Sequence, residues 1–407
     1  MFNTCLIRFA VNQSNDNNEI AKELQTTLRR EAPAPVFVIG SWQTGDFCHI
    51  YAAIVRHFSE TPHSPCSILV LCAEGFSARF LLADIEFAIK PLCDSVGGHF
   101  TLYHTDVLSK NRLIEAMGRL MRTERNAKEP FDATFLASDL VKGMRAGQPL
   151  TPIWAAVTRK AESSHYRDYS GVCASFMEEY VQKFGLSSGR ERFVCLWGRT
   201  SGMPTEARKL GGANPQYDSS EDGNQQLCLA LKYNIPAIKA IFTVGDGFND
   251  ATRRLPHVFD LGEFWRRMQV VKGRFQENGF FDYMTAFFDC DVVHLGMKSG
   301  GMDSLGVWGQ KVVFIDSVRS PAITASRVRA WETPSIVPVP IGAMPTSLGK
   351  AIESAREEDP KSFKTTFASA KKVTEMRDRA ARAGHDNLFE NDDLAAIVAA
   401  VRKMFGN

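Results

Sequence analysis

The sequence predicts an α/β protein with two doubly wound domains, each built on a parallel sheet. Apolar runs of strand length alternate with amphipathic runs of helix length along most of the chain, as in βα units that cover both faces of a sheet. A polar, less regular stretch at residues 145–168 separates two such series. We therefore expect domains at residues 1–185 and 190–346, a joint at Gly185–Gly189, and a charged helical segment at 347–407.

Each series contains five expected strands, recognised by short runs rich in β-branched and aromatic residues. In the first series these runs are residues 4–9, 36–39, 68–71, 100–103 and 133–136, with amphipathic helices such as 47–58 and 110–122 after them. A helix at 173–184 precedes the second series, and its strands are residues 192–197, 237–244, 257–261, 291–295 and 311–315. The last amphipathic helix is expected at 394–405.

The composition excludes several classes of protein. The 407 residues are 44% hydrophobic and 23% charged with a formal net charge of +2, so no basic stripe favours a nucleic-acid partner. None of the nine cysteines forms a C-x-x-C pair, which favours reduced core thiols over a zinc or disulfide framework. No apolar run reaches the roughly 18 residues of a membrane span, and the first residues suit a strand better than a signal peptide. We expect a cytoplasmic protein; the sequence predicts no oligomeric state.

The segment at 291–316 carries the strongest functional signal, because two apolar runs bracket a loop that contains Lys298, Ser299, Gly300 and Gly301. It predicts strand, glycine-rich turn, short helix and strand. In parallel sheets ligands bind at such strand ends, and amide groups at a helix start face anions such as phosphate. Either of two polar residues is expected to cap the helix that follows: Asp303 or Ser304.

Two further loops follow the first strand of the second series. Arg199, with Thr200 and Ser201 beside it, comes directly after that strand, where a guanidinium can hold a phosphate through two parallel N–H groups. The next loop is densely polar and is expected to hydrogen-bond a sugar or ribose through Tyr217, Asp218, Ser219 and Glu221. The alternative is a solvated loop in which the Asp-Ser-Ser run caps the next helix.

A third loop follows the second strand of this series and contains Gly245 and Asp246 within the string G-D-G-F-N-D. The string resembles the acidic motif of haloacid-dehalogenase-type phosphatases, in which Asp246 and Asp250 would hold magnesium. That family also requires an upstream D-x-D nucleophile, but the comparable string, Asp289-Cys-Asp291, comes after the motif. We therefore interpret the loop as a glycine-rich strand-end turn at the ligand site.

The loops around Arg199 and Ser299 together resemble the donor-binding half of GT-B-type glycosyltransferases, which have two Rossmann-like domains facing a central cleft. The run Gly40–Asp46 also looks like the G-D loop of heptosyltransferase-type members. The resemblance implies an acceptor domain first, a nucleotide-sugar domain second, and a last helix that packs back on the first domain. It implies a nucleotide-sugar donor and an acceptor that the sequence does not identify.

The chain departs from the retaining members of that family, because no glutamate occurs between Glu277 and Glu332 to form their spaced pair. An inverting mechanism is therefore favoured, with Asp46 as base or His49 as the second candidate. The structural alternatives are that Asp46 caps the helix from Phe47 and that His49 packs against it. Cationic side chains and loop amides would neutralise the leaving diphosphate, so no metal or cofactor is required.

Two other functions remain open at this point. One is a magnesium-dependent phosphatase or phosphotransferase that uses the acidic motif, and the other is a nucleotide-binding protein without catalysis.

Overall fold

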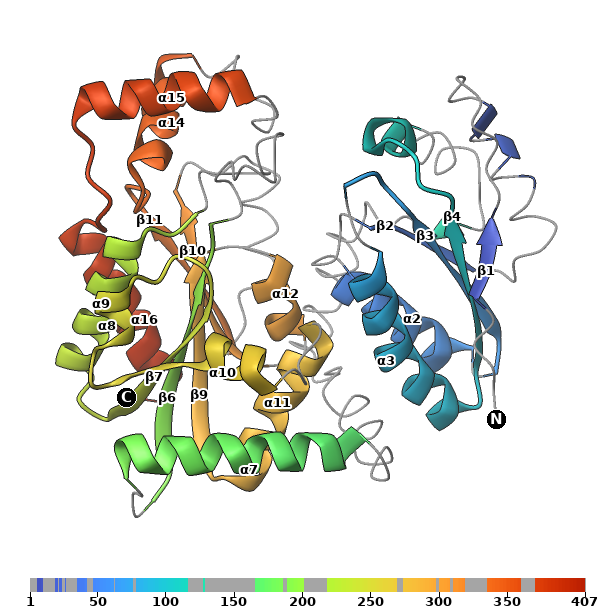
Figure 1. The fold of residues 1–407 in the computed structure, drawn as a ribbon, viewed down its shortest axis with the longest axis horizontal. Helices are drawn as coiled ribbons and strands as arrows, with labels where there is room; N and C mark the ends of the chain where they lie inside the picture. The colour runs from blue at the N-terminus through green and yellow to red at the C-terminus, as the bar shows by residue number, and fades with distance from the viewer. Residues whose placement is uncertain are drawn as a thin grey trace. The chain divides into compact units, whose positions relative to one another are not determined.

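The structure, a computed structural model, describes most of the chain. The described residues are 6–9, 19–20, 22–23, 26, 35–41, 47–61, 63–75, 78–115, 127–128, 165–185, 189–200, 218–268, 274–297, 300–307, 310–318, 335–359 and 370–406. The chain divides into two compact units, and both are α/β with parallel sheets (Figure 1). One unit comprises residues 1–169 and 271–279, and the other comprises residues 170–270 and 280–407.

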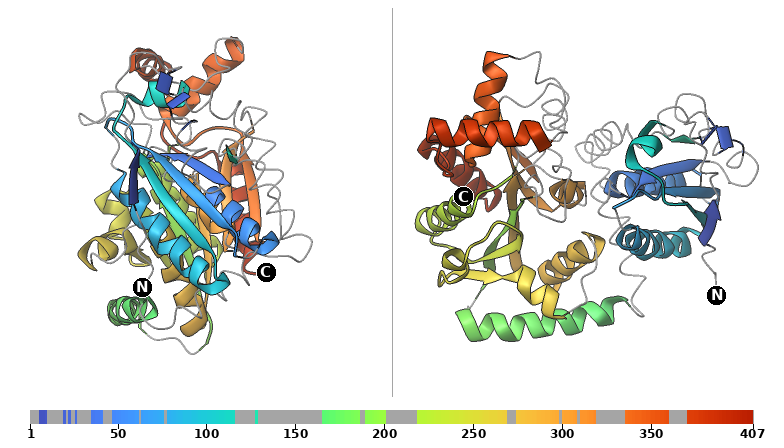
Figure 2. Two further views of the ribbon diagram at one scale, coloured as in Figure 1. Left: turned by 90° about the vertical axis from the view of Figure 1, so that its right-hand side faces the viewer. Right: turned by 45° about the horizontal axis from the view of Figure 1, so that its top comes forward.

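The first unit contains a five-stranded sheet in the order β1-β4-β3-β2-β5, in which every neighbouring pair is parallel. Its strands are Leu6–Phe9 (β1), Val36–Gly40 (β2), Pro65–Leu71 (β3), His99–Thr105 (β4) and Ala127–Lys128 (β5). The helices Phe47–Glu60 (α2) and Arg79–Val96 (α3) pack against each other and against the sheet (Figure 2). Strand residues such as Val38 and Ile68 are fully buried, as a strand covered on both faces requires.

The carboxyl ends of three strands of this sheet are joined by hydrogen bonds. Ser41, the first residue after β2, donates its amide to the carbonyl of Leu71 at 2.9 Å, and its Oγ accepts from the amide of Ala73 at 3.0 Å. The amide of Cys72 donates to Oγ1 of Thr105 at 2.9 Å. The loop that begins at Ser41 therefore starts from a fixed position at the carboxyl edge of the sheet.

The second unit contains a six-stranded, all-parallel sheet in the order β11-β10-β9-β6-β7-β8. Its strands are Glu191–Gly198 (β6), Ile238–Gly245 (β7), Val258–Asp260 (β8), Cys290–Met297 (β9), Lys311–Ser317 (β10) and Ile336–Ile341 (β11). Numbered from β6, the strands follow the order 3-2-1-4-5-6, so the direction of winding reverses between β6 and β9. This is the strand order of dinucleotide-binding folds.

Helices cover both faces of this second sheet. The helices Glu221–Asn234 (α8) and Asn391–Met404 (α16) share one apolar cluster with Leu196, Leu295 and Ile315 of the strands. On the other face, Phe176 of α7 (His165–Phe184) packs edge-on against Phe242, at 5.4 Å between ring centroids. The other helices on that face are Leu261–Met268 (α10), Arg274–Phe287 (α11) and Gly300–Val307 (α12). The two groups of helices are visible on either side of the sheet in Figure 1.

The C-terminal helices belong to the second unit. α14 (Ser347–Glu358) and α15 (Ala370–Ala383) pack on each other beyond the end of the sheet opposite α7 (Figure 1). The apolar face of α16, including Ile397 and Val401, is buried on β9, β10, β11 and α8. The apolar face of the last helix is thus buried in the second unit, and the expectation that this helix also packs back on the first domain stays a prediction.

The sequence pattern predicted neither the two-residue strand β5 nor the last strand of the second sheet, β11. Its sequence, IVPVPI, contains Pro338 and Pro340, and proline cannot donate a hydrogen bond to a neighbouring strand. However, the amides of Val312 and Val318 on β10 donate to the carbonyls of Ser335 and Ile341. The backbone amide and carbonyl groups of the odd-numbered residues of β11 thus point toward β10. Those of both prolines point away from it, so the strand can form at the edge of the sheet.

Several other expectations can be compared with the described residues. Helix α2 begins at Phe47, and residues 110–115 are helical, whereas the expected strand at 133–136 lies outside the described residues. The eight described cysteines are buried, and no disulfide joins them. Among the helices that the structure describes, none is both long enough and apolar enough to cross a lipid bilayer.

Candidate functional site

The carboxyl ends of β6 and β9 form the candidate site, because the winding of the second sheet reverses between them. Trp197 of β6 pairs with Gly296 of β9, so the two strands end at nearly the same level. Arg199 follows β6 directly, and α12 begins at Gly300, just beyond the end of β9. Open parallel sheets bind ligands at this kind of position. The structure thus places the two loops that the sequence analysis singled out on neighbouring strand ends.

Close backbone approach explains two of the glycines at this edge. A Cβ atom on Gly198 would lie 1.9 Å from the carbonyl oxygen of Asp246, and one on Gly245 would lie 2.4 Å from the carbonyl oxygen of Gly198. Gly245 also has a φ of +91°, which glycine adopts without strain. The ends of β6 and β7 are therefore packed backbone to backbone, and the G-D-G string forms the strand-end turn that the sequence predicts.

Arg199 is held by the residues that precede α8. Its Nε lies 3.3 Å from Oδ1 of Asp218, and the two side chains are only 16% and 4% exposed. The Arg199 amide donates to Oγ of Ser219 at 2.8 Å, and the Ser219 amide donates to the carbonyl of Arg199 at 2.8 Å. The structure brings Arg199, Asp218 and Ser219 together, but it uses the Asp218 carboxylate to orient and partly neutralise the guanidinium. A buried pair of this kind is costly to break on one side only.

Asn224 connects the loops after β6 and β7, and the sequence analysis did not identify it. Its side chain is 1% exposed, and its Nδ2 donates to the carbonyl of Gly247 at 2.6 Å and to Oγ of Ser219 at 3.3 Å. The available signal was position: Asn224 lies on the same face of α8 as the buried Leu227 and Leu231. A polar residue on an apolar helix face must be hydrogen-bonded.

The first turn of α8 is acidic and capped. Ser220 is the N-cap, and its Oγ accepts from the amide of Gly223 at 2.9 Å. Glu221, which the sequence analysis assigned to the ligand, and Asp222 are exposed in that first turn, where carboxylates favour the positive end of the helix dipole. Their charge disfavours an anion at the start of α8.

Asp303 and Ser304 do not cap a helix, contrary to the sequence prediction. α12 begins at Gly300, so both residues lie inside it, where they are 0% and 2% exposed. Ser304 Oγ donates to the carbonyl of Gly301 at 2.7 Å, which is a bond within the helix. The sequence pattern placed the start of this helix too late. Two glycines are typical of a loop, and the polar residues that follow them are typical of helix caps.

The acidic motif does not combine with the D-x-D string in this fold. Asp246 is exposed after β7 at the carboxyl edge, whereas Asp289 and Asp291 flank the start of β9 at the amino edge. Eight residues of strand separate the two edges by roughly 25 Å. Asn249 Oδ1 caps a short helix by accepting from the amide of Thr252 at 2.8 Å. No cluster of three possible metal ligands occurs among the described residues.

A buried histidine lies under the candidate site, on the face that α11 and α12 cover. His294 is 0% exposed, and Trp197 Nε1 donates to its Nδ1 at 3.1 Å. The ring of Phe281 meets the imidazole edge-on, at 4.5 Å between centroids. Burial lowers the pKa of His294 to about 3. The imidazole is therefore neutral near pH 7, and Trp197, which is 6% exposed, is a core residue.

Thr200 is half-buried, and its Cγ2 would lie 3.1 Å from a Cβ atom added to Gly247. His49 is in the first turn of α2, but its side chain is not described. Five of the predicted residues lie outside the described residues: Asp46, Ser201, Tyr217, Lys298 and Ser299.

Comparison of the chain with protein-family models, with curated proteins and with solved structures finds no match.

Proposed function

We propose that the chain is a GT-B-type glycosyltransferase that moves a sugar from a nucleotide-diphosphate donor to an acceptor. One observation carries this proposal: Arg199 and the start of α12 flank the strand reversal of a 3-2-1-4-5-6 parallel sheet. The second unit would bind the donor at this carboxyl edge, with its diphosphate at the glycine-rich start of α12. The first unit would bind the acceptor across a cleft.

In the proposed reaction, the acceptor hydroxyl attacks the anomeric carbon while Asp46, or His49, takes its proton. The bond from the anomeric carbon to the diphosphate oxygen breaks, and the configuration inverts. Arg199, Lys298 and the amides of residues 299–301 would neutralise charge on the departing diphosphate without a metal ion. Asp218 would fix the direction of the guanidinium, and Asp246 would accept a hydrogen bond from a ribose or sugar hydroxyl.

The first test is a thermal-shift panel of UDP-, GDP-, ADP- and TDP-sugars, with and without Mg²⁺. A ligand at a hundred times its Kd stabilises the native state by about 2.7 kcal/mol, so one nucleotide should raise the Tm clearly and without Mg²⁺. Stabilisation followed by sugar transfer or hydrolysis supports the proposal. Stabilisation without turnover indicates a non-catalytic nucleotide-binding protein, and Mg²⁺-dependent phosphate release indicates a phosphatase. If no nucleotide raises the Tm, the proposal is wrong.

Arg199 gives the sharpest residue-level test. Arg199→Lys keeps the positive charge beside Asp218 but loses the planar fork that holds two phosphate oxygens. We expect the variant to have the same free energy of unfolding as the unmodified protein. It should bind the stabilising nucleotide at least tenfold more weakly in calorimetry, which corresponds to about 1.4 kcal/mol.

The matched control is Arg254→Lys, because the Arg254 side chain is 83% exposed and pairs only loosely, at 3.8 Å, with Asp250. Its affinity should equal that of the unmodified protein. Equal affinities for the Arg199 and Arg254 variants would remove Arg199 from the ligand site.

A further inference from the structure

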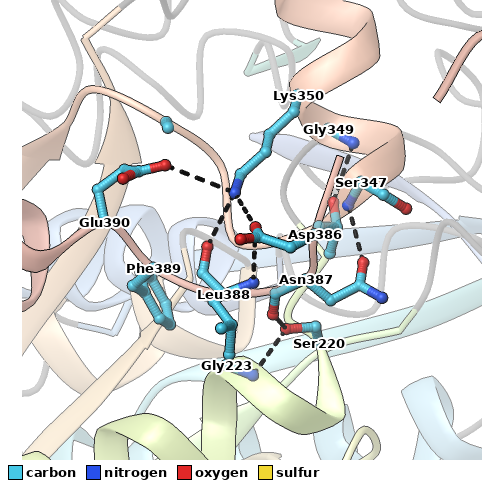
Figure 3. A network of polar contacts seen from close by, with 12 residues as sticks. Ser220, Gly223, Ser347, Gly349, Lys350, Asp386, Asn387, Leu388, Phe389 and Glu390 are labelled. Carbon is cyan, nitrogen blue, oxygen red and sulfur yellow. Dashed lines mark hydrogen bonds and ion pairs between the residues drawn. The ribbon is translucent and has the colours of Figure 1, made fainter. Parts of the chain in front are cut away.

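Residues His385–Glu390, here called the strap, connect α15 to α16 and are bound to two other helices (Figure 3). The carbonyl of Asn387 accepts from Oγ of Ser220 at 2.5 Å, and its Oδ1 accepts from the amide of Ser347 at 2.8 Å. Phe389 exchanges two hydrogen bonds with the Gln226 side chain, at 2.8 and 3.1 Å. The strap therefore bridges the first turns of α8 and α14.

These contacts all lie at one edge of the second sheet. α8 follows β6 and α14 follows β11, and all six strands are parallel, so both helices begin at the carboxyl edge. Asp393, just after the strap, accepts from the amides of Gly342 and Ala343 at 2.9 and 3.1 Å. The strap thus runs along the edge that carries the candidate site, and Ser220, which it contacts, is the neighbour of Ser219.

The side chain of Lys350 holds the charged part of the strap. The Lys350 side chain is only 11% exposed; its Nζ contacts the carboxylate of Asp386, the carbonyl of Leu388 at 3.1 Å and Oε1 of Glu390 at 3.7 Å. Its hydrogen bond is the main reason that the pKa of Asp386 is lowered. The pairing is therefore complete near neutral pH, and it is open to screening because the two carboxylates are 60% and 63% exposed.

The strap has little apolar anchorage of its own. Phe389 is 3% exposed and joins the core cluster, but Asp386, Asn387, Leu388 and Glu390 are all exposed. By contrast, α16 buries five residues, Ile397, Val398, Ala400, Val401 and Met404. Segments with few buried contacts and solvent-exposed hydrogen bonds open at lower free energy than the core.

We propose that the strap is a releasable fastening, which opens and uncovers the first turns of α8 and α14 while the sheet and α16 stay folded. Lys350 and Phe389 are its two fixing points. Opening would free the loop that holds Ser219 and, through it, Arg199, so the state of the strap and the order of the candidate site are coupled. The proposal concerns the fold alone and does not depend on sugar transfer.

The test is amide hydrogen exchange on the full chain, followed by mass spectrometry. In Lys350→Gln, exchange in residues 385–390 and at Ser347 should be at least tenfold faster, whereas exchange in β9 should not change. In the unmodified protein, 1 M NaCl should have the same effect, and the variant should be insensitive to salt. Phe389→Ala should open the same residues by removing the other fixing point.

Arg379→Gln is the matched control, because Arg379 of α15 pairs with Glu358 and hydrogen-bonds to Ser354, both in α14. Its exchange in residues 385–390 should equal that of the unmodified protein. The proposal is overturned if Lys350→Gln leaves strap exchange unchanged. It is also overturned if β9 exchange accelerates equally, since the strap would then open only when the whole unit unfolds.

Discussion

Gly198 occupies the most crowded backbone position at the candidate site. An added methyl group would lie 1.9 Å from the Asp246 carbonyl and 2.6 Å from the Phe248 ring, and one of these obstacles is backbone. We expect Gly198→Ala to lower the free energy of unfolding by about 1–3 kcal/mol, the usual cost of overpacking, measured by urea denaturation. Gly171→Ala in α7 is the control, because no atom lies within 4 Å of its Cβ position; it should be neutral or slightly stabilising. Equal effects of the two substitutions would contradict the close approach of β6 and β7.

His294 makes the stability of the second unit sensitive to acid. Its folded pKa, about 3, lies below the ordinary histidine value, so the unfolded chain binds the proton first. The contribution of the neutral imidazole to the free energy of unfolding is complete above about pH 6.5. It decreases as the pH falls, by about 2 kcal/mol between pH 6.5 and 5.

His294→Asn keeps an acceptor for Trp197 Nε1 but cannot be protonated. We expect lower stability at pH 7.5, because a cavity forms, and a shallower loss of stability from pH 6.5 to 5 in urea denaturation. His257, whose pKa is also lowered chiefly by burial, remains in both proteins. Parallel pH profiles would show that His294 is not the titrating group.

The candidate site was partly predictable at the level of residues. Arg199 and the glycine turn at 300 could be found because strand ends and glycines are visible in a sequence. The pairing of Arg199 with Asp218 could not be predicted, because the two residues are far apart in the sequence and a sequence does not specify the path of the loop between them. Asn224 was missed because its two partners, Ser219 and the Gly247 carbonyl, come together only when β6 and β7 are adjacent.

At the level of elements, helix caps differ in how many bonds they make. Ser220 caps α8 and also donates to the strap at Asn387, whereas Thr346 caps α14 through the Gly349 amide alone in the contacts described. We expect Thr346→Ala to lower the free energy of unfolding by about 1 kcal/mol. Ser220→Ala should cost about 1 kcal/mol more, since it removes a second hydrogen bond. Chemical denaturation measures both, and equal losses would mean that the strap bond contributes nothing.

Strands with uninterrupted apolar runs were predictable, and those that depend on their neighbours were not. The patterns for β2, β6, β7, β9 and β10 agree with the structure within one or two residues, because strands buried on both faces have a strong local signal. β11 was missed because its prolines are compatible only with an edge position. The start of α12 was misplaced because its glycines are unusual inside a helix.

At the scale of the whole molecule, each unit buries its own apolar core. Ile68 and Leu69 lie in the first, and Val293 and Leu295 lie in the second. We expect Gly198→Ala to lower the urea midpoint for β9 peptides and to leave β3 peptides at their normal midpoint, as followed by hydrogen exchange. If both midpoints fall together, the two cores unfold as one cooperative system.

The two edges of the second sheet affect whether copies of this protein associate through their strands at high concentration. One edge strand, β8, is only three residues long, and the other, β11, turns two prolines outward. Neither offers a continuous row of free amides to a passing chain, and exposed edges with such rows are templates for aggregation. The folded second unit should therefore resist fibril-like association through the edges of its sheet.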